Sequence, residues 1–457
     1  MAVTVRVTSV RPFWDLTVDA QGDPDPAQRD ALLSGVVAAG STDLAVFSHG
    51  WNNDVSTAST LYDRFFAPFP GLLAAAPAVP AARFGYVGVH WPSMRFSDEP
   101  IPDFPHQSVA APTGQDPISA FLGPEARAAL ARVFPGREPV IGRLAELLAQ
   151  QPADAGALDE FAAAVRTLTG GPADPATARF AQDLPGTGGA PALLTGDPAA
   201  ACQALADALE QAGCPVAPAD DGQALLGGLG KRVWDGAREL LRQATYYTMR
   251  ARAGTVGQLG LGPLLGQLAQ RAPGVRIHLI GHSFGARLVS FALLGLGEDA
   301  AGAAGQDAPG VASVTLLQGA FSHYAFSGPL PFDSGGGALH AALQRVKGPL
   351  VACHSSHDEA LGVLYPVASR LAGEDRSLLG LGDRWGALGH DGFQQLPGAR
   401  ALMLADALAG PLPASGPVSV DASAVVCSGG PPSGAHSDIC HAELARLVLR
   451  AAGRIPG

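Results

Sequence analysis

Ser283 is the residue of this chain whose setting best suits nucleophilic chemistry. It stands at the centre of a GxSxG pattern formed by Gly281, His282, Ser283, Phe284 and Gly285. An apolar run over 275–280 ends where the pattern begins, and a helical pattern over 286–296 follows it. A serine between a buried strand and a helix lies on a tight turn that holds its hydroxyl outward, and the start of the helix favours negative charge on a nearby substrate oxygen. Because the bare pattern arises easily by chance in a chain with 58 glycines, the flanking strand and helix carry the prediction of a nucleophile.

Short runs rich in branched and aromatic residues predict the strands that would position this serine. They cover residues 44–47, 84–89, 275–280, 311–317, 350–353 and 418–427. Helical patterns lie between most of them, such as the apolar positions Leu288, Phe291 and Ala292. Strands that alternate with helices predict an α/β fold with a mainly parallel, doubly wound sheet covered on both faces.

The alternation of strands and helices breaks after Trp91. From residue 98 to about residue 228 the sequence shows no convincing strand, only helical stretches separated by proline and glycine. Two of these stretches carry apolar residues three or four positions apart, at Ile141, Leu144, Leu147 and Leu148 and at Leu158, Phe161, Val165 and Leu168. Helices packing on each other explain such faces most simply. We therefore predict a core domain from residues 1–97 and 229–457 and a helical insertion over 98–228.

The strand, serine turn and helix around Ser283 resemble those of the α/β-hydrolase superfamily of esterases, lipases and related enzymes, in a mainly parallel sheet with a helical cap or lid. A second match follows the strand 44–47, where members of the family often carry a His-Gly step; here the segment reads Ser48, His49, Gly50, Trp51, Asn52 and Asn53, without the HGGG form. The resemblance implies an oxyanion hole made by the backbone N–H groups of Trp51 and Phe284. It also implies a substrate site lined by His49, Gly50, Asn52 and His282. The alternative for this stretch is an ordinary strand end and surface loop in which Trp51 only packs.

The resemblance also implies where the acid of a catalytic triad lies, because the chain order in the family is serine, acid, histidine. The run 350–353 leads into His354, Ser355, Ser356, His357 and Asp358, and Asp358 is the predicted acid. Glu359 and Asp333 are weaker candidates for the same role. Two other interpretations are that Asp358 caps a helix and that His354, His357 and Asp358 bind a metal ion, although no matching ligand group is visible.

Three histidines beyond Asp358 could serve as the base that takes the proton of the serine. His436 follows a Gly/Pro/Ser-rich loop over 429–435, between the last predicted strand and a helix expected to begin near residue 439. His441 falls in the first turn of that helix, and His390 lies in a Gly-rich segment before the last strand. His436 is therefore the predicted base, with His390 and His441 as alternatives. His282 is expected to pack under the serine turn and to transfer no proton.

Composition excludes several other classes of protein. The 30 basic and 41 acidic residues give a net charge of −11, which argues against nucleic acid or an anionic membrane surface as the main partner. Five cysteines without a CxxC pair predict neither a zinc site nor a thiol-exchange site. No phosphate loop, dinucleotide fingerprint or HExxH motif occurs, so neither a cofactor nor a metal is expected.

The N-terminus alternates Val3, Val5 and Val7 with polar residues, which is a strand pattern rather than a secretory signal. No apolar run is long enough to span a bilayer. A soluble, cytoplasmic protein is therefore expected.

These observations favour a serine hydrolase with the triad Ser283, His436 and Asp358. The expected reaction is the hydrolysis of a small carboxylic ester through an acyl-enzyme intermediate, and the apolar faces of the insertion hint at an apolar acyl or aromatic ester. A thioesterase or a peptidase could use the same triad. A non-catalytic scaffold that binds a ligand or a protein partner through the insertion is the alternative from another class, since fold alone does not guarantee chemistry.

Overall fold

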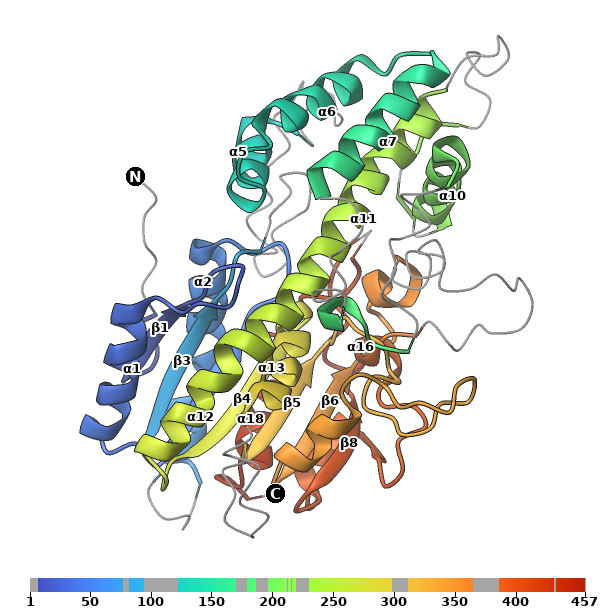
Figure 1. Ribbon diagram of the computed structural model, residues 1–457. Coiled ribbons are helices and arrows are strands. Elements are labelled where there is room, and N and C mark those ends of the chain that lie inside the picture. The colour runs from blue at the N-terminus through green and yellow to red at the C-terminus, as the bar shows by residue number, and fades with distance from the viewer. Residues whose placement is uncertain are drawn as a thin grey trace.

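One parallel sheet forms the centre of the fold (Figure 1). The structure, a computed structural model, describes residues 7–76, 82–93, 122–169, 179–185, 196–211, 213–214, 216–218, 230–297, 311–364, 386–430 and 433–456. Within these ranges the strand order is β1-β3-β2-β4-β5-β6-β8-β7, and every neighbouring pair is parallel. The strands are β1 (Phe13–Thr17), β2 (Asp43–Ser48), β3 (Phe84–His90), β4 (Arg276–His282), β5 (Ser313–Leu317), β6 (Pro349–His354), β7 (Arg400–Met403) and β8 (Gly416–Asp421).

Helices cover both faces of the sheet, as predicted. Successive side chains of a strand point to opposite faces, so Leu44 and Val46 of β2 enter one apolar core while Ala45 and Phe47 enter the other. The first core is closed by α1 (Pro26–Ala38), α11 (Lys231–Thr255), α12 (Gly262–Arg271) and α13 (Phe284–Gly295), and the second by α2 (Val55–Phe66), α3 (Phe69–Ala74), α17 (Leu404–Ala409) and α18 (Ala442–Ala451). Shorter helical turns are η2 (Val256–Leu261), η3 (His340–Arg345), η4 (Ala360–Leu364) and α16 (Leu388–Asp391).

The structure corrects the strand predictions at the edges of the sheet. The predicted strand 418–427 stops at Asp421, because the Asp421 carboxylate accepts a hydrogen bond from the Ser423 N–H and turns the chain. The strands β1 and β7 were not predicted; β7 is largely exposed and shows no apolar run. Of the predicted N-terminal strand, residues 1–6 lie outside the described part of the chain, and Val7 belongs to no strand.

The described part of the insertion is helical, as predicted. It contains α5 (Pro124–Val133), α6 (Glu138–Gln150), α7 (Ala155–Thr169) and α10 (Pro198–Gln211), and the apolar faces predicted on α6 and α7 are buried. Figure 1 shows these helices beyond the end of the sheet, with the 25-residue helix α11 rising from the sheet to join them. The predicted domain limits at residues 98 and 228 lie outside the described ranges. None of the described helices, α11 included, combines the length and apolar character needed to cross a bilayer.

Candidate active site

Ser283, His436 and Asp358 form one hydrogen-bonded chain. The Ser283 hydroxyl lies 2.9 Å from His436 Nε2, and His436 Nδ1 donates to Asp358 Oδ2 across 2.7 Å. The three residues follow β4, β8 and β6 in the chain, and these strands lie close together in the sheet. Because the carboxyl ends of parallel strands meet at one edge, side chains 153 and 78 residues apart in sequence come into contact there. The structure thus brings together the three residues that the sequence predicted as a triad.

The turn that presents Ser283 needs small residues on both sides. Ser283 has a backbone φ of 56°, in the left-handed region, between the last residue of β4 and the first residue of α13. A Cβ atom on Gly281 would lie 2.4 Å from the Gly285 carbonyl oxygen, and one on Gly285 would lie 2.0 Å from the carbonyl oxygen of Ser48. The GxSxG spacing therefore reflects close backbone packing as well as the strained serine.

Replacing Gly285 with alanine is expected to lower the free energy of unfolding by about 3 kcal/mol, because the new methyl group overlaps a buried carbonyl. Gly142 is a matched control, since it lies inside α6 and a Cβ there would meet nothing within 4 Å. Gly142→Ala should raise stability by about 0.5–1 kcal/mol. Urea unfolding of both variants provides the measurement, and equal effects at the two positions would contradict the packing assigned to Gly285.

The Asp358 carboxylate is buried and held by several donors. Its side chain accepts hydrogen bonds from the Leu361 N–H at 3.0 Å on Oδ1 and from Gln318 Nε2 at 3.3 Å on Oδ2, besides that from His436. The Leu361 contact is an N-terminal helix cap of η4, so the capping role considered from the sequence coexists with the contact to His436. With these donors on it, the carboxylate holds the His436 ring with its Nε2 toward Ser283.

His282 supports the catalytic histidine from beneath. It is 3% exposed, and its Nε2 lies 2.9 Å from the carbonyl oxygen of His436. Burial lowers the pKa of His282 to about 3, so the ring is neutral and Nε2 carries the hydrogen that the carbonyl accepts. The expected packing under the turn is found, with a hydrogen bond to the His436 backbone, and the place of His282 in the substrate site stays a prediction.

His49 stabilises the turn after β2. Its ring stacks on Trp91 at 5.6 Å, its Nδ1 contacts the Gly50 carbonyl oxygen at 2.8 Å, and Nε2 accepts from the Trp91 N–H. Burial lowers the pKa of His49 to about 3, which keeps the ring neutral and fits one hydrogen on Nδ1. These contacts hold the loop, and the place of His49 in the substrate site stays a prediction.

The loop Gly50, Trp51, Asn52 and Asn53 runs directly beside the serine turn. A Cβ atom on Gly50 would lie 2.7 Å from the Ser283 Cβ, and the Trp51 ring lies 6.4 Å from that of Phe284. The Asn53 side chain donates to the carbonyl oxygens of Gly50 and Trp51, and Asn52 has a positive φ of 66°. Phe284 begins α13, so its N–H has no acceptor within the helix. Gly50 thus lies beside the serine, and Trp51 and Phe284 remain the predicted oxyanion donors.

The rival residues from the sequence lie in other contacts. His390 Nδ1 and His323 Nδ1 share the Asp391 carboxylate at 2.6 and 2.9 Å. His441 directly precedes α18, and its Nε2 lies 2.7 Å from Asp438 Oδ1. Asp333 binds the Gly335 N–H on an exposed loop. Among the described residues, no group of His, Cys, Asp or Glu is arranged to hold a metal ion, His354 and His357 included.

A buried ionic cluster, which sequence patterns did not indicate, connects the insertion to the serine helix. Asp183 bonds to Arg287, which lies one turn after Ser283 in α13, and at 2.8 Å to Arg250 of α11. Its Oδ2 also accepts from the Ser322 N–H, in the loop after β5. All three charged side chains are nearly inaccessible to solvent, so this carboxylate contacts two guanidinium groups in the interior of the protein.

Replacing Asp183 with asparagine is expected to destabilise the fold by about 3 kcal/mol, because it removes a buried negative charge that two buried guanidinium groups contact. Asp207→Asn is the matched control, since Asp207 is half exposed in its pair with Arg232 and such a pair contributes about 1 kcal/mol or less. Urea unfolding of both variants compares them. A loss no larger than that of Asp207→Asn would show that the cluster contributes little.

Comparison of the chain with models of protein families, with curated proteins and with solved structures gives no match. The function is therefore argued from the geometry of the site.

Proposed function

We propose that this chain is a serine hydrolase of the α/β-hydrolase superfamily that cleaves a carboxylic ester through an acyl-enzyme intermediate. The observation that carries the proposal is the continuous chain from the Ser283 hydroxyl through His436 to Asp358, with both hydrogen bonds under 3 Å. Its setting adds support, because the serine lies on a strained turn between a central parallel strand and a helix. The α/β fold does not by itself bring a serine, a histidine and an aspartate side chain into one hydrogen-bonded chain, so this arrangement favours catalysis.

The first half of the reaction transfers the acyl group to the enzyme. Ser283 Oγ attacks the carbonyl carbon of the ester while His436 Nε2 takes the hydroxyl proton, which gives a tetrahedral intermediate. The bond to the alcohol oxygen then breaks, and His436 returns its proton to that oxygen. The alcohol leaves, and the acyl group stays on Ser283 as an ester.

The second half restores the enzyme with water. His436 takes a proton from a water molecule, the hydroxyl oxygen attacks the acyl carbon, and the Ser283 oxygen leaves with the proton from His436. A carboxylic acid is the product. In both halves Asp358 orients the ring and stabilises the imidazolium, which its buried position and short contact to Nδ1 support.

The negative oxygen of each tetrahedral intermediate requires donors that are already in place. The Phe284 N–H stands at the start of α13, where the positive end of the helix dipole also acts. The Trp51 N–H is the proposed second donor, because its loop runs within van der Waals distance of Ser283. The contacts of His49 and Asn53 hold this loop and would limit its reorganisation during the reaction.

The position of the insertion supports an apolar substrate under a cap. Its helices lie beyond the carboxyl ends of the strands, where Ser283 is found (Figure 1). Tyr246 of α11 packs on Phe284 at 4.6 Å and on Trp51 at 5.8 Å, so aromatic rings border the reacting serine. Such surroundings favour an aromatic or aliphatic acyl group over a charged one.

Labelling with a fluorophosphonate probe tests the proposal directly. The probe should attach to Ser283 of the folded protein, as located by peptide mass spectrometry, and Ser283→Ala should abolish labelling. Ser290→Ala is the matched control, since Ser290 lies in the same helix with its hydroxyl bonded to the Ala286 carbonyl. A folded protein that does not react with the probe would favour the non-catalytic interpretation.

A panel of substrates separates the possible leaving groups. We expect p-nitrophenyl butyrate and benzoate to be hydrolysed faster than the matching thioesters and anilides. Faster cleavage of a thioester or of a peptide bond would reassign the reaction while leaving the triad in place.

Replacing His436 with glutamine is expected to lower kcat/KM for the best ester by about 10⁴-fold, because no other described imidazole contacts the serine hydroxyl. His390→Gln and His441→Gln are the matched controls, and both should stay within about threefold of the wild type. A stronger effect at His390 or His441 than at His436 would show that the base has been misassigned.

A further inference from the structure

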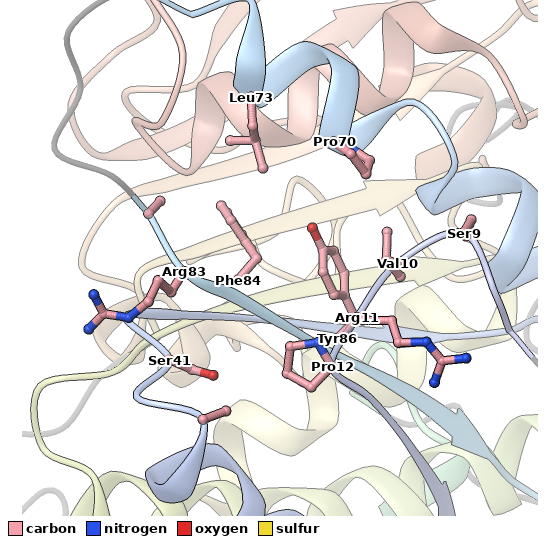
Figure 2. A pocket seen from close by; sticks show the side chains of 12 residues that line it. Ser9, Val10, Arg11, Pro12, Ser41, Pro70, Leu73, Arg83, Phe84 and Tyr86 are labelled. Atoms are coloured by element: carbon pink, nitrogen blue, oxygen red, sulfur yellow. The ribbon is translucent and has the colours of Figure 1, made fainter.

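A cavity lies at the amino ends of the strands, at the opposite end of the sheet from Ser283. Figure 2 shows it at the start of β3, where Phe84 and Tyr86 are the first and third residues of the strand. Its volume is about 590 Å³, within the range of small-molecule sites. The triad follows the carboxyl ends of the strands, so this cavity is separate from the candidate active site.

The walls of the cavity are largely apolar. Leu73 and Pro70 of α3 face Phe84 and Tyr86 across the open space, and Pro12 closes the side next to β1 (Figure 2). The Phe84 and Tyr86 rings stack with centroids 5.9 Å apart at an angle of 26°. A flat or chain-like apolar body could therefore lie between α3 and these rings.

Two residues in the lining carry hydroxyl groups for which no hydrogen bond is found in the described part of the chain. Tyr86 is 3% exposed and Ser41 8% exposed, and no hydrogen bond from either hydroxyl is found there. In Figure 2 the Tyr86 hydroxyl points toward Pro70 and Leu73, into the cavity. Burial raises the pKa of Tyr86, so the group stays protonated and can donate. Neither hydroxyl oxygen is among the described buried polar atoms that lack a partner, so both face the open space of the cavity and can donate to a ligand that carries hydrogen-bond acceptors.

The charge around the cavity is positive although the chain is acidic. Arg11 and Arg83 lie on opposite sides of it, and the described lining residues include no Asp or Glu (Figure 2). Arg83 is partly engaged, because its Nε donates to the Gly40 carbonyl at 2.6 Å. Arg11 is exposed and forms no ion pair within the described ranges. Because the chain as a whole has a net charge of −11, two arginines without an acidic neighbour in the lining favour the binding of an anionic ligand at this cavity.

We propose that this cavity binds a small amphipathic organic anion, an aromatic or aliphatic carboxylate or sulfonate. Its apolar body lies between Leu73 and Phe84, an oxygen accepts the hydrogen bond from Tyr86, and its negative group faces Arg11. This inference does not depend on the proposed hydrolase activity, because none of these residues belongs to the Ser283 site.

Fluorescence titration of the full-length protein with 8-anilinonaphthalene-1-sulfonate tests the inference. We expect one saturable site, with N-phenyl-1-naphthylamine, which has the same rings but no sulfonate, bound about tenfold more weakly. Arg11→Glu should weaken sulfonate binding by about tenfold as well. Arg400→Glu makes the same charge change on the exposed strand β7 at the far edge of the sheet, and should leave binding unchanged.

A second variant keeps the test decisive if Arg11→Glu does not fold. Tyr86→Phe preserves the ring packing and removes only the hydroxyl, so it should weaken the sulfonate by about threefold to fivefold. Three results would overturn the inference: equal affinity for the charged and uncharged dyes, equal losses in Arg11→Glu and Arg400→Glu, or no saturable binding at dye concentrations up to about 1 mM.

Discussion

Ser283→Ala is expected to lower kcat for ester hydrolysis by about 10⁴-fold to 10⁶-fold, because the variant keeps the oxyanion donors and loses the nucleophile. The fold should survive the change. The only hydrogen bond of the hydroxyl found in the described structure is to His436, and alanine and serine are similar in their tolerance of the positive φ at this position. Initial rates with p-nitrophenyl butyrate and a urea unfolding curve of the same sample give the two quantities needed.

Ser290→Ala again supplies the control for this experiment. Both serines belong to the segment 283–295, but the Ser290 hydroxyl bonds to a backbone carbonyl inside α13 and has no contact with His436. Its kcat should remain within about threefold of the wild-type value. If Ser283→Ala retained more than about a tenth of the wild-type rate while remaining folded, another nucleophile would have to carry the reaction.

The parts of the site that could be predicted from the sequence are those fixed by local rules and by sheet topology. Ser283 follows from a strand, two glycines and a helix within about twenty residues. Asp358 and His436 could be chosen because each follows a predicted strand, and parallel strands place their carboxyl ends at one edge. The predicted strand 418–427 is longer than β8, which ends at Asp421, but this error did not affect the choice of His436. The loop that precedes His436 follows Cys427 both in the prediction and in the structure.

The contacts that support the triad could not be predicted, because each depends on a pairing without a local pattern. The packing of His282 under the turn was expected, but its hydrogen bond to the His436 carbonyl was not, and neither was the stacking of His49 on Trp91. Asp183 finds Arg287 across 104 residues of sequence, and nothing near Asp183 marks it as buried. The same holds for the cavity shown in Figure 2, where Ser41 precedes β2 and Tyr86 belongs to β3.

The edge strands escaped prediction for a different physical reason. β7 lies at one end of the sheet with three of its four side chains exposed, so burial selects no apolar run there. In contrast, every residue of β2 and β3 is buried, and the sequence is apolar enough to be identified. Pattern-based prediction is therefore most reliable at the centre of the sheet, which is also where Ser283 is positioned.

Asp358→Asn is expected to lower kcat/KM by about 10⁴-fold with little change in shape. In the structure, Oδ1 accepts from the Leu361 N–H and Oδ2 accepts from His436 Nδ1. If the amide oxygen of asparagine keeps the Leu361 contact, its NH₂ group faces His436 and donates to Nδ1. The imidazole hydrogen must then move to Nε2, where the ring can no longer accept the proton of Ser283. If the amide turns the other way, its NH₂ group meets the Leu361 N–H and a buried hydrogen bond is lost.

Asp391→Asn is the matched control, because Asp391 also accepts from histidine Nδ1 atoms, those of His323 and His390, but has no contact with the triad. Its kcat/KM should stay within about threefold of the wild type. The tautomer argument further requires that labelling of Ser283 by the fluorophosphonate slows in Asp358→Asn by a factor similar to that in kcat/KM, since both reactions need the same proton transfer. Unchanged labelling in a folded Asp358→Asn protein would show that Asp358 only caps η4 and that His436 is oriented by its backbone contacts alone.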